Sequence, residues 1–203
     1  MISAIILAGG KGKRMGAPVS KQFIEIKGKP IIYYTIKKFS ENKKIDNIVV
    51  VLSKDEVGYF KENILEKYNL KVDNIVIGGT ERQDSVYNGL KSLEDTNTDI
   101  VLIHDGARPF ISDRIIDDGI KFAQVYGACA PGVMPKDTIK IKNESNFSVS
   151  TPDRGSLVAI QTPQVFKFNE ILECHEKIKI NNIVVTDDRS EEHTSELQSL
   201  CCI

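Results

Sequence analysis

Residues 2–16 read Ile-Ser-Ala-Ile-Ile-Leu-Ala-Gly-Gly-Lys-Gly-Lys-Arg-Met-Gly, a short apolar strand that runs directly into a basic, glycine-rich loop. Three further β-branched runs follow along the chain, at Asn47–Leu52, Asn74–Ile77 and Ile100–Ile103. They are apolar on both faces and alternate with segments of helical periodicity, which is typical of a buried parallel sheet covered by helices. We therefore predict an α/β fold with a mainly parallel sheet that begins with Ile2–Leu7.

Helix start signals precede several of the helical segments. Pro30 fits the first helical position of a helix over Ile31–Phe39. Ser112 is placed to cap a helix over Arg114–Tyr126. Two Ser/Thr-x-x-Glu/Gln patterns predict capping boxes, at Ser53 with Glu56 and at Thr80 with Gln83.

The chain changes character after Tyr126, where short strands and turns replace the helices. The predicted strands are Ala128–Met134, Thr138–Lys142, Val149–Thr151 and Leu157–Thr162, with Asn143–Asn146 as the tip of a hairpin. A last helix is predicted over Asn169–Lys179, ahead of an apolar run at Ile183–Val185. Because neither a repeat nor a linker interrupts this order, we expect residues 1–188 to form a single domain.

The composition is that of one globular domain. The 203 residues, 41% hydrophobic and 27% charged, suffice for a core without disulfides or a structural metal. A formal charge of -1 argues against a nucleic-acid or membrane partner. The cysteines lack C-x-x-C spacing, and the apolar run after Met1 is too short for a signal peptide. We expect a cytoplasmic, reduced protein.

The segment from Arg189 onward, Arg-Ser-Glu-Glu-His-Thr-Ser-Glu-Leu-Gln-Ser, departs from the rest of the chain. It has no apolar period and resembles the translated read-through of a sequencing adapter. A natural disordered tail is the alternative. We expect residues 189–203 to be a non-native tail.

The glycine-rich loop after the first strand indicates a phosphate ligand. Its glycines let backbone N–H groups approach phosphate oxygens, and Arg14 and Lys21 can neutralise the charge that develops during phosphoryl transfer. A Walker loop is excluded, because no Gly-Lys-Ser/Thr ends the segment. A dinucleotide fingerprint, and with it a dehydrogenase, is disfavoured because Gly10, Gly12 and Gly16 are spaced G-x-G-x-x-x-G. The alternative is a basic surface loop without a ligand.

Two further polar motifs follow predicted strands. His-Asp-Gly-Ala-Arg-Pro at 104–109 comes at a carboxyl strand end, the edge where open α/β sheets bind ligands. Asp105 is therefore a candidate ligand for Mg²⁺ or for a substrate hydroxyl, the alternative being an Asp-Gly turn. We expect His104 to be structural rather than catalytic. Gly-Gly-Thr-Glu-Arg-Gln-Asp-Ser-Val at 78–86 predicts a helix N-terminus, where backbone groups and Ser85 can meet a ligand.

Together these motifs resemble the 2-C-methyl-D-erythritol 4-phosphate cytidylyltransferase family. The resemblance runs in order from Met1 to Asp188 and includes Lys21-Gln22-Phe23, Asp137-Thr138, Thr162-Pro163-Gln164 and Thr186-Asp187-Asp188. It implies a Rossmann-like, three-layer nucleotidyltransferase fold with a protruding β-arm, at about 136–156, that crosses a homodimer. It also implies an enzyme of non-mevalonate isoprenoid biosynthesis. Such an enzyme uses CTP, Mg²⁺ and the methylerythritol phosphate, forms 4-diphosphocytidyl-2-C-methyl-D-erythritol and releases pyrophosphate.

The resemblance further implies roles for individual residues. Arg14 and Lys21 are the expected catalytic residues, which clamp the triphosphate and stabilise the transition state. The expected nucleotide-binding residues are Ala8, Gly9, Gly10, Lys11, Gly12, Gly79, Thr80 and Ser85. The expected substrate-binding residues are Asp105, Ala107, Arg108, Thr138, Arg154 and Thr162. Of these, Thr138 and Arg154 would reach the substrate bound to the partner subunit, and Asp105 is also the expected metal ligand.

The end of the chain departs from the family pattern. The family continues after Thr-Asp-Asp with a strand and an Asn-Ile-Lys segment whose lysine binds phosphate, whereas this chain carries the divergent tail there. Two alternatives to the expected function stay open. One is a cytidylyltransferase for ribitol 5-phosphate or another polyol phosphate, and the other is an inactive nucleotide-binding fragment.

Overall fold

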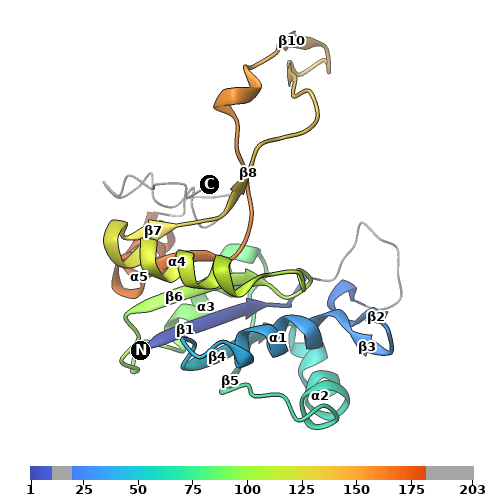
Figure 1. Ribbon diagram of the computed structural model, residues 1–203, viewed down its shortest axis with the longest axis vertical. Coiled ribbons are helices and arrows are strands. Elements are labelled where there is room, and N and C mark those ends of the chain that lie inside the picture. The colour runs from blue at the N-terminus through green and yellow to red at the C-terminus, as the bar shows by residue number, and fades with distance from the viewer. Residues whose placement is uncertain (11–19, 182–203) are drawn as a thin grey trace.

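A six-stranded sheet forms the centre of the computed structural model, which describes residues 1–10 and 20–181 (Figure 1). The strands lie in the order β5-β4-β1-β6-β12-β7; the pairings from β5 to β6 are parallel, whereas β12 is antiparallel to both of its neighbours. Their bounds are β1 (Ile2–Leu7), β4 (Asn47–Leu52), β5 (Asn74–Ile77), β6 (Ile100–Asp105), β7 (Ala128–Cys129) and β12 (Gln164–Lys167). The predicted α/β fold with a mainly parallel sheet is confirmed.

Helices cover both faces of the sheet, so the domain has three layers. Because successive strand residues point to opposite faces, Ile6 packs in one apolar cluster and Ile5 in the other. The first face is covered by α1 (Ile31–Glu41), α2 (Val57–Phe60) with the helical turn Lys61–Glu66 that continues it, and α4 (Asp113–Tyr126). The second face is covered by α3 (Arg82–Lys91) and α5 (Phe168–Asn181). In Figure 1, α1 and α4 lie in front of the sheet and α3 lies behind it.

Of two predicted helix caps, the one at α4 is confirmed and the one at α3 is displaced. Ser112 caps α4 as expected, because its Oγ accepts a hydrogen bond of 3.3 Å from the backbone N–H three residues on. The capping box predicted for Thr80 and Gln83 is wrong by one residue. Glu81 and Asp84 form it instead, with the Asp84 carboxylate accepting from the Glu81 N–H at 3.3 Å. A pair of carboxylates thus replaces the expected hydroxyl and amide.

Two other helix starts differ from the prediction. Pro30 is the residue before α1 rather than its first residue, since it pairs in the small hairpin of β2 (Glu25–Ile26) and β3 (Lys29–Pro30). Ser53 and Glu56 do not form a capping box. Their side chains bond to each other at 2.7 Å beside a single 3-10 turn.

The strands of the second half are shorter than predicted. The run Ala128–Met134 is divided into β7 and β8 (Gly132–Val133), because Pro131 between them has no N–H to donate. β8 pairs antiparallel with β11 (Ala159–Ile160), which occupies only part of the predicted Leu157–Thr162. β12 was not predicted. Its apolar centre is two residues long, and its strand character comes from its place between β6 and β7.

A β-arm leaves the domain between β8 and β11 and projects far beyond the sheet (Figure 1). Its strands β9 (Ile141–Lys142) and β10 (Ser148–Ser150) pair antiparallel, and the hairpin tip predicted at Asn143–Asn146 is confirmed. Asn146 turns the chain with a φ of 65°, a left-handed conformation that asparagine tolerates. No residue from 133 to 158 is buried. The arm therefore has no core of its own within this subunit.

The C-terminal boundary stays a prediction. Residue 188, the run Ile183–Val185 and the tail lie outside the described residues. Within residues 1–10 and 20–181, no helix combines the length and the apolar character needed to cross a bilayer.

Candidate active site

The carboxyl ends of the parallel strands bring the predicted site residues to one edge of the sheet. Leu7 at the end of β1 is in register with Asp105 at the end of β6, and the N–H of Gly106 donates to the Leu7 carbonyl at 2.8 Å. On the other side, the Ala8 N–H donates to Val51 of β4 at 2.7 Å. β1 lies between β4 and β6, which is the point where the strand order reverses. Open α/β sheets bind ligands at this kind of crevice.

Lys21 is held close to this edge by its two neighbours in sequence. It begins the 3-10 turn Lys21–Phe23 and is exposed, whereas Gln22 and Phe23 are buried. The Gln22 amide donates from Nε2 to the backbone carbonyl of Ala8, at the end of β1. Lys21 is therefore an exposed cation on a turn anchored to the first strand. The other predicted loop residues, Lys11, Gly12 and Arg14, lie outside the described residues.

The start of α3 forms a second wall of the same edge. Ser85 accepts from the Gly79 N–H at 3.1 Å and donates to the Glu81 carbonyl at 3.1 Å, so its hydroxyl shapes the turn. A Cβ at Gly79 would lie 2.1 Å from the Cβ of Asp84, which excludes any side chain there. Thr80 and Gly79 are exposed on this turn. The predicted nucleotide-binding residues of this segment thus form a tight, accessible turn.

Asp105 forms the polar centre of the edge. Arg108 approaches one carboxylate oxygen through Nε at 2.8 Å, and Arg82 from the start of α3 approaches the other at 3.6 Å. Arg108 also donates through Nη1 to the side-chain oxygen of Gln161. Two guanidinium groups and one carboxylate leave a net positive charge, and the side chains are a third to a half exposed. This arrangement suits a phosphate or a polyol phosphate.

The same contacts bear on the metal role predicted for Asp105. Both of its oxygens face guanidinium groups, and a cation bound there would have to displace at least one of them. Among the described residues, no group of three or more His, Cys, Asp or Glu side chains could hold a metal. One carboxylate can hold Mg²⁺ together with phosphate oxygens and water, so the metal role of Asp105 stays a prediction, in which the ion would compete with Arg108 and Arg82.

His104 lies beneath this cluster and is buried. Its Nε2 lies 3.0 Å from the Arg108 carbonyl and its Nδ1 lies 3.0 Å from the Thr162 hydroxyl. Burial lowers the pKa of His104 to about 4, although the Arg108 carbonyl and the Asp105 charge oppose the shift. A neutral imidazole with both ring nitrogens in hydrogen bonds agrees with the structural role expected for this residue.

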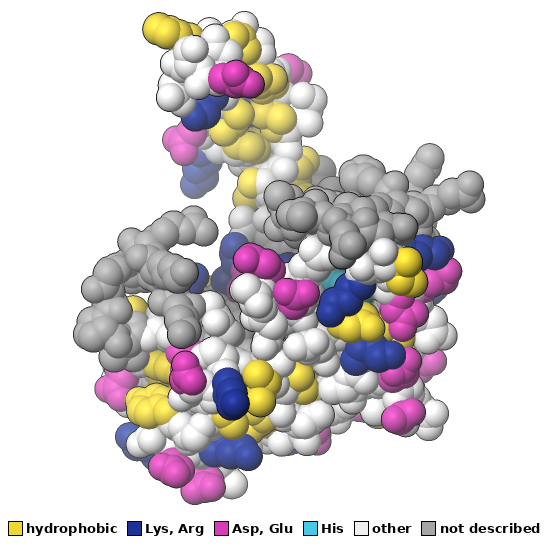
Figure 2. Space-filling model, turned by 180° about the vertical axis from the view of Figure 1, so that it is seen from behind, with side chains coloured by type: hydrophobic (Ala, Val, Ile, Leu, Met, Phe, Trp, Pro, Cys, Tyr) yellow, Lys and Arg dark blue, Asp and Glu magenta, His cyan; other side chains and the backbone are white. Residues whose placement is uncertain are grey.

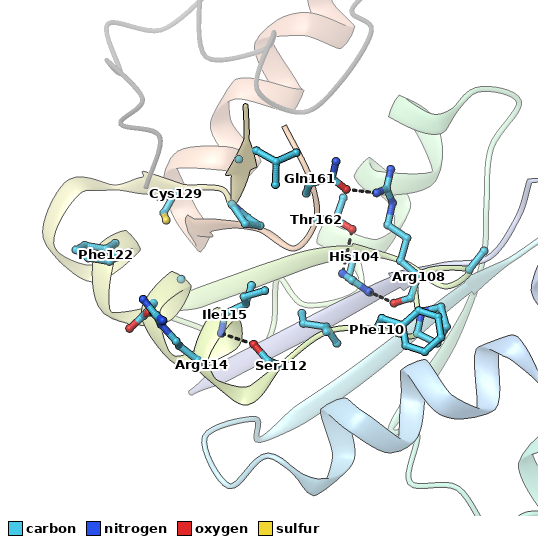
Figure 3. A pocket seen from close by; sticks show the side chains of 18 of the residues that line it. His104, Arg108, Phe110, Ser112, Arg114, Ile115, Phe122, Cys129, Gln161 and Thr162 are labelled. Carbon is cyan, nitrogen blue, oxygen red and sulfur yellow. Dashed lines mark hydrogen bonds and ion pairs between the residues drawn. The ribbon is translucent and has the colours of Figure 1, made fainter. Parts of the chain in front are cut away.

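A cavity of 790 Å³ opens beside the cluster (Figure 3). At one end lie the polar side chains of Arg108, Gln161 and Thr162, and Ala107 also lines the cavity. At the other end Figure 3 shows the apolar side chains of Ile115 and Phe122, carried by α4. The cavity can therefore accept a small molecule whose charged group faces Arg108.

The remaining predicted site residues, Thr138 and Arg154, lie on the arm and are exposed. Neither lines the cavity of its own subunit, and the arm projects away from the sheet edge (Figure 1). The structure thus unites Ala8, Gly9, Gly10, Lys21, Gly79, Thr80, Ser85, Asp105, Ala107, Arg108 and Thr162 at one edge and leaves the arm residues apart.

Comparison with known proteins identifies the family. The 2-C-methyl-D-erythritol 4-phosphate cytidylyltransferase family matches residues 2–196 of the chain. The chain belongs to this family. The predicted resemblance is therefore confirmed, and with it the enzyme class of the cytidylyltransferases, a group of nucleotidyltransferases.

Individual members of the cytidylyltransferase family match over most of their length. The enzyme of Clostridium perfringens is 63% identical over 187 residues, which are 92% of this chain and 82% of that protein. The enzyme of Clostridium beijerinckii is 60% identical over 190 residues, covering 94% of this chain and 83% of that protein. The crystal structure of 4-diphosphocytidyl-2C-methyl-D-erythritol synthase from Anaerococcus prevotii superposes with a TM-score of 0.85 at 35% identity, covering 99% of this chain and 85% of that one.

Two members of the polar cluster were missed by sequence analysis. Arg82 was noted only as part of the motif at 78–86, and Gln161 only as a member of the predicted strand Leu157–Thr162. Arg82 meets Asp105 across the sheet edge, and Gln161 meets Arg108 because the chain returns from the arm at this point. Neither partnership has a local sequence signal.

Proposed function

We propose that this chain transfers the cytidylyl group of CTP to 2-C-methyl-D-erythritol 4-phosphate and releases pyrophosphate. The observation that carries the proposal is the sheet edge itself, where the anchored Lys21, the turn at Gly79 and the cluster around Asp105 lie beside the carboxyl ends of the parallel strands. Family membership supports the choice of substrates, because the relatives are named as cytidylyltransferases of 2-C-methyl-D-erythritol 4-phosphate.

The proposed chemistry is an in-line displacement. A phosphate oxygen of the acceptor attacks the α-phosphorus of CTP, the new P–O bond forms, and the bond to the β-phosphate breaks with pyrophosphate as the leaving group. Lys21 would stabilise the charge that builds up on the triphosphate, and Arg108 would hold the acceptor phosphate. Positioning and charge neutralisation suffice for such a step, so no covalent enzyme intermediate is required.

Mg²⁺ is proposed to enter with CTP as part of the substrate. Mg²⁺ commonly binds phosphate oxygens and keeps several waters, with few protein ligands. This proposal is compatible with a site where Asp105 is occupied by two arginines. In this proposal Asp105 is not itself a metal ligand, unlike in the expectation drawn from the resemblance.

Pyrophosphate release from CTP and Mg²⁺ tests the function directly. We expect release with 2-C-methyl-D-erythritol 4-phosphate and little with ribitol 5-phosphate, using the full chain. Release with ribitol 5-phosphate alone would instead establish the alternative polyol-phosphate enzyme. A folded sample that CTP stabilises against heat, yet that releases no pyrophosphate with either acceptor, would be an inactive nucleotide-binding protein.

The arm supports a homodimer as the working form of the enzyme. Its large apolar side chains are exposed, among them Ile141, Phe147 and Val149 with exposed fractions of 52%, 71% and 60%. Figure 2 shows hydrophobic side chains gathered along the arm. Apolar patches of this kind usually mark an interface. We propose that the arm lies across a second copy of the chain, where Thr138 and Arg154 complete the acceptor site.

Complementation between two inactive variants tests the arm. In a heterodimer of a Lys21→Glu chain and an Arg154→Ala chain, one site combines an intact Lys21 with an intact partner arm. Random mixing makes half of the dimers mixed, so we expect roughly a quarter of wild-type activity from two nearly inactive parents.

A mixture no more active than its parents would show that Arg154 acts within its own subunit or not at all. As a control, two chains that both carry Lys21→Glu should give no recovery. Size-exclusion chromatography of each variant shows whether the dimer persists.

A further inference from the structure

The hydrogen bonds of His104 determine which of its ring nitrogens carries the proton. Nε2 lies 3.0 Å from the backbone carbonyl of Arg108, and a carbonyl oxygen can only accept. Nε2 must therefore be the donor. Burial favours the neutral imidazole, in which the other nitrogen, Nδ1, is an acceptor.

This tautomer fixes the direction of the next hydrogen bond. Nδ1 lies 3.0 Å from the hydroxyl of Thr162, and because Nδ1 accepts, Thr162 donates its only hydroxyl proton to it. The backbone N–H of Asp105 points at the same oxygen from 3.4 Å. Thr162 thus donates inward to His104 and has no further proton to donate.

Thr162 is also one of the residues that line the cavity. Thr162 is half-buried and lines the cavity together with His104 and Arg108, as Figure 3 shows. Its remaining lone pair can accept a hydrogen bond from a ligand hydroxyl. Because Thr162 has no proton left to donate, it cannot form a hydrogen bond with an ionised phosphate oxygen, which also carries no proton. The phosphate of a ligand would therefore lie toward the guanidinium of Arg108 and its hydroxyls toward Thr162.

The packing around His104 preserves this arrangement. The ring of Phe39 from α1 lies 5.0 Å from the imidazole at an angle of 49° and closes its apolar side. The charged groups that face the imidazole are Asp105 and Arg108, whose effects on its protonation oppose each other. Burial thus keeps the imidazole neutral, and both of its nitrogens form hydrogen bonds.

We propose that His104 is a positioning residue that fixes Thr162 as a hydrogen-bond acceptor, so that Thr162 selects a hydroxyl of the polyol phosphate. The inference rests on the proposed function and names the group of the acceptor that Thr162 recognises. His104 itself need not touch the substrate. A merely structural histidine would stabilise the loop without affecting which hydroxyl is required.

Deoxy analogues of 2-C-methyl-D-erythritol 4-phosphate, each lacking one hydroxyl, provide the test. We expect the wild type to reject one analogue by at least about tenfold in kcat/KM, because a site built to bond a hydroxyl discriminates strongly against its loss. Thr162→Val should lose this discrimination and raise the KM for the acceptor on the order of tenfold to a hundredfold, with the KM for CTP nearly unchanged. Thr162→Ser, which keeps the hydroxyl, should retain the discrimination.

His104→Gln should lose the same discrimination, since glutamine can bond the Arg108 carbonyl but lacks the fixed acceptor for Thr162. The double variant with Thr162→Val should be no worse than either single variant. Arg114→Gln, at the end of the cavity away from Thr162 and with an 88% exposed side chain, is the matched control and should leave the discrimination intact. Equal discrimination in the wild type and in Thr162→Val would overturn the proposal.

Nitrogen-15 shifts of the imidazole test the tautomer in the wild-type protein, without any substrate. We expect Nε2 protonated and Nδ1 unprotonated from about pH 6 to about pH 8, with the His104 signal identified by its loss in His104→Gln. A protonated Nδ1 would overturn the proposal even if the enzyme is active. Failure of the wild type to use any acceptor would instead overturn the proposed function, whatever the tautomer.

Discussion

Lys21→Glu is expected to lower kcat at least about a hundredfold, while the KM for CTP changes much less. A single well-placed donor or cation that acts on transition-state charge contributes on the order of 3 kcal/mol, and reversing the charge also adds repulsion. Lys21 meets the requirement of a fixed position, because Gln22 and Phe23 are buried and Gln22 bonds to the end of β1. Steady-state rates of pyrophosphate release at varied CTP provide the measurement.

The matched control for Lys21 is Lys43→Glu. Lys43 is exposed between α1 and β4, at the amino ends of the strands and opposite to the site, and the change of charge is the same. We expect its kcat to stay within about twofold of wild type, as for most surface changes. If Lys21→Glu raised the KM for CTP as much as it lowered kcat/KM, with kcat unchanged, Lys21 would be a binding residue only.

Asp105→Asn is expected to lower kcat/KM for the acceptor roughly thirtyfold with little effect on CTP. The substitution keeps the shape of the side chain but removes the charge that holds Arg108 at 2.8 Å and Arg82 at 3.6 Å. Charge-assisted hydrogen bonds contribute about 2 kcal/mol, and the partial exposure of these side chains makes this an upper figure. Initial rates of pyrophosphate release at varied methylerythritol phosphate and saturating CTP give the measurement.

Two comparisons separate the possible roles of Asp105. Asp118→Asn is the control, because Asp118 pairs with Arg114 at 3.3 Å at the other end of the same cavity. It should change kcat/KM less than about threefold, as expected for an exposed ion pair. A titration with Mg²⁺ addresses the metal. Recovery of Asp105→Asn at high Mg²⁺ would mean that Asp105 binds the metal after all, whereas we expect no recovery.

The first half of the fold was predictable because its signals are local. β1, β4 and β5 begin and end at the predicted residues. β1 and β4 are short apolar runs buried on both faces, and β5 is a β-branched run at the edge of the sheet, where it is only partly buried. β6 extends two residues further than predicted, through His104 and Asp105. Polar residues can continue a strand when its neighbours supply the pairing, and here β1 does so.

The second half was less predictable because its pairing is not local. β12 has only Val165 and Phe166 as apolar residues, and it becomes a strand by filling the space between β6 and β7. The capping of α3 was displaced to Glu81, which forms a reciprocal capping box with Asp84 that hydroxyl preference did not predict. Local propensity is a weak prior when tertiary contacts compete with it.

The sequence by itself determined the layered α/β fold, the family, and the positions of Gly9 and Gly10 after β1 and of Asp105 at the end of β6. These follow from short-range periodicity and from residue types whose chemistry does not depend on distant partners. Only the tertiary structure decided the pairing of Arg82 with Asp105, of Gln161 with Arg108 and of His104 with Thr162. The physical reason is that hydrogen bonds and ion pairs act over a few ångströms. The partners of these pairs come from segments up to 58 residues apart, so only the folded chain brings them within reach.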